Sequence, residues 1–186
     1  MKSISLFSIF TILLTSTSAF SMQTGAISIG GNGCFGASGL IEVNGESGRY
    51  AFPIRVRVNK KSETSFDRKT CNIRLPISLA ANEKVQLINL SQVVRVVGYA
   101  GAEVKSNLNM SFAGRSAQPL VFETKITDNE PSVIEILKND GVVAESACGK
   151  DTMLTGNLSI LANGAGTQAF ITTGSAMLTL KVVTCN

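Results

Sequence analysis

Histidine and tryptophan are both absent from this chain of 186 residues, and charged residues make up only 16% of it. Without an imidazole base, neither a Ser-His-Asp nor a Cys-His catalytic arrangement can form. The cysteines never occur as C-x-x-C, whereas zinc sites normally use such close ligand pairs. No segment has the periodicity of a helix. We therefore expect no metal and no cofactor.

Only one long apolar run is present, and it stands at the N-terminus. Lys2 precedes an apolar stretch from Ile4 to Leu14, and small residues follow up to Ser21. This order is typical of a secretory signal peptide, with cleavage expected before Met22. The run is shorter than the roughly 20 residues that cross a bilayer. We expect residues 1–21 to be a signal peptide and residues 22–186 to be one secreted, periplasmic or extracellular domain.

The four cysteines also indicate export. In an oxidising compartment an even number of cysteines favours disulfides over free thiols. Three pairings of Cys34, Cys71, Cys148 and Cys185 are possible. We prefer Cys34–Cys71 with Cys148–Cys185, which pairs cysteines 37 residues apart in both cases. Each bridge would stabilise the fold by roughly 4 kcal/mol in the chain-entropy model.

Alternating apolar and polar residues dominate the mature chain. From Cys71 to Leu79, every second residue is apolar, which predicts a strand with one face in a core and the other in water. Many short segments of this kind, separated by turn residues, are typical of a sandwich or barrel. We predict an all-β fold, an antiparallel β-sandwich of jelly-roll-like type. The expected strands are residues 26–29, 40–43, 50–58, 71–79, 85–88, 92–97, 105–113, 120–127, 132–137, 142–144, 154–161, 168–172 and 176–184.

Turns are expected where glycine accompanies small polar residues. Asn139-Asp140-Gly141 predicts a hairpin turn, because these residues accept positive φ. Thr173-Gly174-Ser175 predicts another turn near the end of the chain. In the first part of the chain, residues Gly31 to Gly36 match the motif G-x-G-x-x-G. No helix is expected after it, so we interpret it as a loop that packs around Cys34 and not as a dinucleotide site.

A set of short blocks runs across the chain in order: Gly33-Cys34, Cys71 to Pro76, Gly98-Tyr99, Met110 to Gly114, Ala147 to Gly149, Asn157 to Leu161 and Cys185. On these blocks, the chain resembles the small secreted four-cysteine proteins of the domain of unknown function number 4360. Its first cysteine is followed by Phe35, where the family tends to have proline, and Val182-Val183-Thr184 replaces aromatics before the last cysteine. The resemblance implies a secreted, disulfide-bonded β-fold and brings no activity with it.

Positive charge is concentrated in one segment. The mature chain carries a net charge of +3, but residues 49–74 contain eight basic and two acidic residues. Arg55 and Arg57 are expected on one strand face, and Arg74 would lie beside them if the two strands pair. Such a patch would attract an anionic polysaccharide or envelope surface. The alternative is a solvated face whose charges discourage edge pairing.

Three functions follow as hypotheses. The first is a non-enzymatic protein associated with a surface, wall or matrix, with either a binding or a structural role. Its ligand contacts would lie at Arg55, Arg57 and Arg74. The second is an extracellular polysaccharide-acting enzyme with paired carboxylates, for which Glu103, Glu123 and Glu135 are candidates without a local signal. The third is a pilus-type subunit, which would present a free N-terminal strand around residues 23–29. Nucleic acid is not expected, since few aromatics accompany the basic residues. N-glycosylation acceptors stand at Asn89, Asn109 and Asn157.

Overall fold

The computed structural model describes residues 22–34, 40–44, 47–52, 57–59, 66–113, 115–127, 133–164 and 169–185. All regular structure in these ranges is β-strand. The strands are β1 (Gln23–Thr24), β2 (Ser28–Gly30), β3 (Leu40–Asn44), β4 (Ser47–Phe52), β5 (Arg57–Asn59), β6 (Phe66–Ser78), β7 (Glu83–Gly98), β8 (Ala102–Phe112), β9 (Arg115–Ser116), β10 (Leu120–Lys125), β11 (Val133–Glu145), β12 (Thr152–Gly164) and β13 (Ala169–Thr184).

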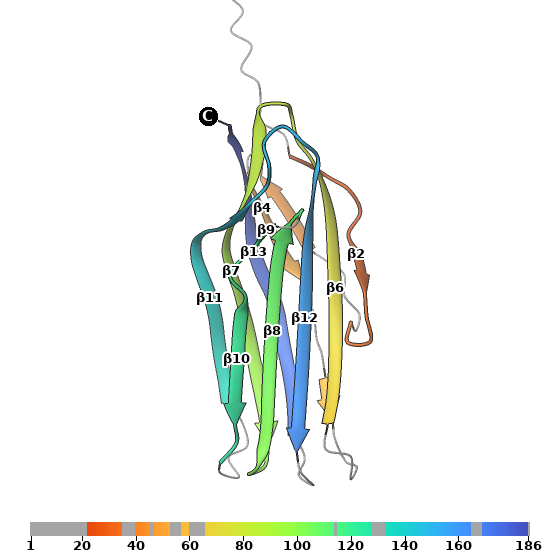
Figure 1. Cartoon of the computed structure of the whole chain (residues 1–186), viewed down its shortest axis with the longest axis vertical. Helices are drawn as coiled ribbons and strands as arrows, with labels where there is room; N and C mark the ends of the chain where they lie inside the picture. Colours follow the sequence, from red (N-terminus) through yellow and green to blue (C-terminus); the bar gives the residue numbers. More distant parts are fainter. Residues whose placement is uncertain are drawn as a thin grey trace, which may run out of the picture.

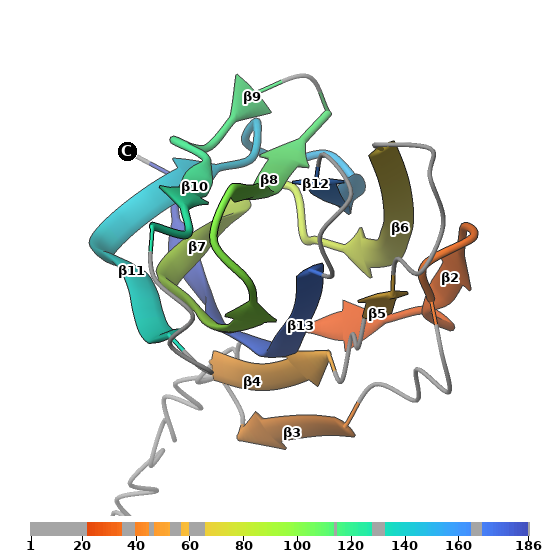
Figure 2. The same ribbon diagram turned by 90° about the horizontal axis from the view of Figure 1, so that it is seen from below.

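The strands form two antiparallel sheets. The seven-stranded sheet has the order β1-β6-β12-β8-β10, with β2 also paired to β6 and β9 to β8. The six-stranded sheet has the order β11-β7-β13-β4-β3, with β5 also paired to β13. The long strands run along the long axis of the molecule (Figure 1). Seen along that axis, β7 and β13 form one layer and β8, β12 and β6 the other (Figure 2).

The core lies between the sheets and follows the alternation of the sequence. Cys71, Ile73, Leu75 and Ile77 on β6 are at most 1% exposed, and the residues between them are exposed. The same alternation runs through β7, β8 and β12. Burial of one face of each sheet against the other is the driving force for this architecture. The predicted all-β, antiparallel sandwich is confirmed.

Both disulfides have the predicted pairing. Cys34 is bonded to Cys71 with a Cα–Cα distance of 5.1 Å, and Cys148 is bonded to Cys185 with a Cα–Cα distance of 6.0 Å. The first bridge attaches the segment after β2 to β6. The second attaches the segment between β11 and β12 to the end of β13. Both bridges therefore connect segments that are distant in the sequence.

The predicted hairpin turn at Asn139-Asp140-Gly141 is wrong. β11 continues through it as one strand, and its register with β7 shifts between Asn139 and Val142. Gly141 has a φ of 80°, and its N–H donates to Asn89 Oδ1 at 3.0 Å. Asn89 itself has a φ of 55°. The glycine therefore forms a β-bulge that bends the ladder without reversing the chain.

Thr173-Gly174-Ser175 is likewise not a turn. These residues lie within β13, whose register with β7 shifts between Thr173 and Ala176. The segments predicted as 85–88 and 92–97 also belong to one strand, β7. The expected strand 50–58 corresponds to β4 and β5, with residues 53–56 outside the described residues. Long strands that pass through small residues and bulges explain the differences in β7 and β13.

The expected signal peptide, residues 1–21, lies outside the described residues. Within the described ranges, no helix is long and apolar enough to cross a membrane.

Candidate functional site

The outer face of the seven-stranded sheet carries an ordered array of small polar side chains. Strands β6, β12 and β8 are consecutive neighbours there and place their residues in rows, because cross-strand partners share a face. Figure 1 shows these three strands side by side. We call this array the asparagine face; its nine members are Arg74, Thr155, Ser111, Asn72, Asn157, Asn109, Thr70, Ser159 and Asn107.

The central row of the asparagine face consists of three asparagines. Asn72 on β6 pairs with Asn157 on β12, which pairs in turn with Asn109 on β8. All three residues are exposed. Their side chains have no hydrogen-bond partner in the part of the chain that the structure describes. Each amide thus presents two donor hydrogens and one carbonyl acceptor to the solvent.

The two flanking rows add hydroxyl groups and a guanidinium. On one side, Arg74, Thr155 and Ser111 are in register, and the Ser111 and Thr155 hydroxyl oxygens lie 2.6 Å apart. On the other side, the row consists of Thr70, Ser159 and Asn107. Hydrogen bonding between neighbouring side chains restricts their rotamers, so part of the array is held in place before any ligand arrives.

This composition is unusual for the middle of a sheet. Asparagine is depleted in strands, where β-branched and aromatic residues are preferred. The asparagine face nevertheless holds four asparagines in the central parts of three long strands. Solubility alone would be met equally well by lysine, which only donates hydrogen bonds, or by glutamate, which only accepts them. The choice of asparagine therefore points to a requirement for groups that both donate and accept hydrogen bonds.

Charge surrounds the asparagine face and is partly unpaired. Lys105 on β8 forms an ion pair with Glu123 on β10. Its hydrogen bond to Glu123 raises the pKa of Lys105 above the ordinary value. Arg68 Nε donates to Ser159 Oγ at 3.2 Å. Neither Arg68 nor Arg74 has a carboxylate partner within the described ranges, so both remain able to bind an anionic group.

Two of the arginines predicted as an anion-binding patch, Arg57 and Arg74, lie in different sheets. Arg74 is exposed on β6. Arg57 begins β5, which pairs with β13 of the other sheet, opposite Thr172. Arg55 lies outside the described residues. Neither β4 nor β5 pairs with β6, so the strand pairing that would have placed the three side by side is not observed. The patch stays a prediction, and only Arg74 belongs to the asparagine face.

The candidate carboxylates are divided between the two sheets. Glu103 and Glu123 lie on neighbouring strands, β8 and β10, where each is directly opposite a lysine. Glu135 is exposed on β11 of the other sheet. Within the described residues, no group of three or more cysteine, aspartate or glutamate residues could hold a metal ion. The enzyme hypothesis stays a hypothesis, with Glu103 and Glu123 as the two candidates on neighbouring strands.

The N-terminal segment is docked on its own domain. β1 and β2 pair with β6, and Gly25 N–H donates to Pro76 O at 3.0 Å. Gly31 packs against the backbone of Thr70 and Cys71, where a side chain would clash. Asn32 Oδ1 accepts a hydrogen bond from Thr70 N at 2.8 Å. The described part of the glycine-rich motif, residues 31–34, thus packs against β6 beside the first disulfide. The strand expected of a pilus-type subunit is not free, because β1 and β2 are paired to β6.

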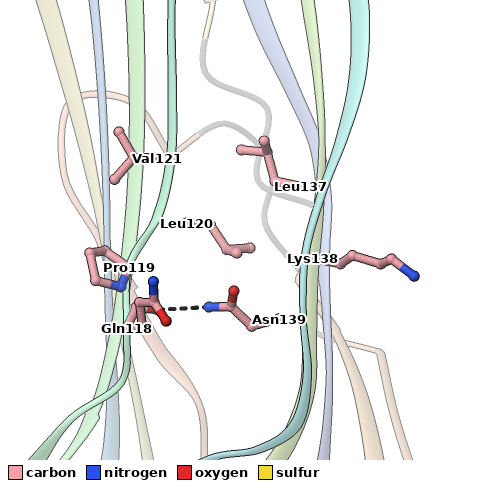
Figure 3. A pocket seen from close by; sticks show the side chains of 7 residues that line it. All are labelled: Gln118, Pro119, Leu120, Val121, Leu137, Lys138 and Asn139. Carbon is pink, nitrogen blue, oxygen red and sulfur yellow. Dashed lines mark hydrogen bonds between the residues drawn. The ribbon is translucent and has the colours of Figure 1, made fainter.

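A groove of about 430 Å³ lies between the edge strands β10 and β11. Leu120 and Leu137 point into it from the two sides, while Lys138 points away (Figure 3). Asn139 Nδ2 donates to Gln118 O at 2.9 Å and joins its two walls. We interpret the groove as the seam where the edges of the two sheets approach each other.

Sequence reasoning missed the asparagine face. The alternation in residues 105–113 already placed Asn107 and Asn109 on an outer face. Their alignment with Asn157 and Asn72 depends on strand neighbours more than 40 residues away in the chain. The usable signal was the recurrence of asparagine at outward positions of separate predicted strands.

No protein-family model matches the chain, and no curated protein matches it. The resemblance to the domain of unknown function number 4360 therefore stays a prediction. TmCBM61, solved in complex with β-1,4-galactotriose, shares 12% identity, with 85% of this chain and 88% of that chain covered and a TM-score of 0.31. A family 11 carbohydrate-binding module from Clostridium thermocellum, solved with a β-1,3-1,4-mixed-linked tetrasaccharide, shares 8% identity, with 88% and 91% covered and a TM-score of 0.25. At these TM-scores, neither similarity carries an argument about function.

Proposed function

We propose that the mature chain is an exported, non-enzymatic protein that binds polysaccharide of a cell envelope or matrix through the asparagine face. The observation that carries this proposal is the central row of three exposed asparagines, whose side chains have no hydrogen-bond partner among the described residues. Sugar hydroxyls donate and accept hydrogen bonds, and asparagine amides match both properties. Two disulfides support export, because disulfides persist outside the reducing cytoplasm.

Two arginines that have no carboxylate partner within the described ranges, Arg68 and Arg74, extend the proposal to acidic polysaccharides. Arg74 stands in a flanking row, and Arg68 contacts Ser159 of the other flanking row. Guanidinium groups bind carboxylate, sulfate or phosphate through paired hydrogen bonds. A ligand with such groups would bind more tightly at low salt, since exposed charges are screened as ionic strength rises. Arg55 and Arg57, predicted from the sequence, are included in the proposal as a separate contact region.

The test is a pull-down of the mature protein on its own cell envelope and on neutral and acidic polysaccharides, at low and high salt. The protein is made in a host without N-glycosylation, so that Asn109 and Asn157 stay unmodified. Asn109→Ala/Asn157→Ala is expected to weaken binding at least tenfold, because each lost hydrogen bond contributes about 1 kcal/mol. Thr179→Ala/Lys181→Ala, on the six-stranded sheet, is the matched control and should bind like the wild type.

The arginine variants separate the two contact regions. Arg74→Ala should reduce the salt-sensitive part of binding, and Arg95→Ala, an exposed arginine on the six-stranded sheet, should not. If Arg55→Glu/Arg57→Glu abolishes binding while Asn109→Ala/Asn157→Ala leaves it intact, the ligand contacts the sequence-predicted arginines and the asparagine face is not the site. Absence of binding to every polysaccharide and to the envelope would overturn the proposed function itself.

A further inference from the structure

The asparagine face repeats with two different periods. Neighbouring strands lie about 4.8 Å apart, whereas residues on one face of the same strand are separated by roughly 6.7 Å. The rows that cross the strands therefore have the shorter period, and the columns along each strand have the longer one. A repeating ligand in contact with several equivalent asparagines must match one of these periods.

We propose that the ligand of the asparagine face is an extended, β-linked polysaccharide that lies across the strands, with one sugar over each of β6, β12 and β8. This inference rests on the proposed function. In an extended β-linked chain each sugar advances by nearly the spacing between neighbouring strands, which the central row reproduces. Asn72, Asn157 and Asn109 would each contact one successive sugar.

The rows beside the central one fit a flat ribbon. An extended β-linked chain carries hydroxyl groups along both of its edges. Arg74, Thr155 and Ser111 border one side of the central row, and Thr70, Ser159 and Asn107 border the other. The sheet thus offers hydrogen-bonding groups beneath the ribbon and along both edges. A coiled α-linked chain cannot keep three successive sugars against one flat row.

The row can be extended beyond β6. Gly30 of β2 pairs with Asn72 and occupies the next position along the central row. It has no side chain, and the space where a Cβ would stand is open. In the flanking row, Ser28 of β2 is opposite Arg74, and Ser116 of β9 is opposite Ser111. Gly30 therefore places no side chain in the path of a longer polymer that continues along the central row.

The first experiment measures affinity against ligand length. The probes are β-1,4-linked oligosaccharides of glucose, mannose, xylose and N-acetylglucosamine with two to six sugars, and α-1,4-linked gluco-oligosaccharides of the same lengths. We expect affinity for at least one β-linked series to rise about tenfold from two to four sugars and then to level off, with the α-linked series at least tenfold weaker. Equal affinity for α- and β-linked chains, or binding independent of length, would overturn the inference while leaving the proposed function standing.

The second experiment measures the direction of the ligand. Asn72→Ala/Asn109→Ala removes both ends of the central row, whereas Asn107→Ala/Asn109→Ala removes two neighbours on one strand. The first variant should lower affinity for the four-sugar ligand several-fold more than the second and should abolish the gain from two to four sugars. The opposite order would mean that the ligand lies along the strands. Failure of the wild type to bind any glycan or its own envelope would instead overturn the proposed function.

Discussion

A single asparagine decides the local path of β7 and β11. Asn89 has a positive φ, which asparagine tolerates better than most residues, and its side chain accepts the Gly141 N–H. Asn89 and Gly141 thus stabilise the bulge together, from strands 52 residues apart in the sequence. From the sequence alone, Asp140-Gly141 is indistinguishable from a hairpin turn. The deciding partner, Asn89, is visible only once the two strands are paired.

The carboxylate of Glu145 gives a prediction on pH. Its Oε2 accepts a hydrogen bond from Lys84 Nζ at 2.9 Å and another from Gln86 Nε2 at 3.3 Å. These donors, Lys84 first, lower the pKa of Glu145 in the folded protein. A carboxylate with a lowered pKa stabilises the fold above its unfolded pKa, and this stabilisation is lost as the pH falls through the folded pKa.

We expect Glu145→Gln to lower the free energy of unfolding at neutral pH by less than about 1 kcal/mol, because the pair is partly exposed. In acid, below the lowered pKa, the variant and the wild type should become equally stable. Denaturant unfolding at a series of pH values measures this difference. Asp140→Asn, which removes the more exposed pair with Lys138, is the control and should change little. A difference that persists in acid would contradict the assigned cause.

At the scale of elements, strand faces were predictable and strand neighbours were not. Burial alternates from Cys71 to Ser78 as the sequence indicates, because a strand directs successive side chains to opposite faces. The predicted strand lengths were too short where glycine lies inside β11 and β13. The continuous hydrogen-bonded ladders with β7 outweigh the local turn propensity there. The asparagine face depends on register, which long-range pairing determines. This is why its separate residues could be placed but their alignment could not.

The segment that covers the edge of β6 gives a prediction about the first disulfide. β1 and β2 are short, and Gly33 N–H adds a hydrogen bond to Thr70 O at 3.0 Å. Cys34→Ala/Cys71→Ala should lower the free energy of unfolding by roughly 4 kcal/mol in the chain-entropy model. It should also speed amide exchange at Gly25 and Gly33, because the segment loses its covalent attachment.

The second disulfide is the matched control. It joins residues with the same sequence separation of 37, so Cys148→Ala/Cys185→Ala should lose a similar free energy of unfolding. In this variant, the amides of Gly25 and Gly33 should exchange no faster than global unfolding of the variant itself allows. Unchanged exchange at both amides in Cys34→Ala/Cys71→Ala would show that hydrogen bonds alone hold the segment on β6.

At the scale of the whole molecule, the interior between the sheets contains two buried polar side chains that have no hydrogen-bond partner among the described residues. Gln92 on β7 is 1% exposed, and neither atom of its side-chain amide has a hydrogen-bond partner among the described residues. Ser106 on β8, in the opposite sheet, is also fully buried and has an unpartnered hydroxyl. Buried polar atoms without partners are destabilising by about 1–3 kcal/mol.

We expect Gln92→Met to raise the free energy of unfolding by about 1 kcal/mol, because methionine has a similar shape and requires no hydrogen bond. Ser106→Ala removes the hydroxyl from the opposite layer and should stabilise the fold by a smaller amount. Thermal and denaturant unfolding report both changes. A loss of stability in Gln92→Met would indicate that internal water satisfies the glutamine amide, and solvent in the core could then be sought directly.

The positions of the two disulfides also decide what a protease can do to this protein. Cys34–Cys71 and Cys148–Cys185 each enclose a long stretch of chain near one end of residues 22–186. A single cut inside either stretch severs the backbone but leaves both pieces joined through sulfur. Such a nicked chain would still migrate as one species without reductant and would separate only after reduction. Where proteases are common and reductants scarce, one cleavage inside either stretch would therefore not separate the two pieces of the chain.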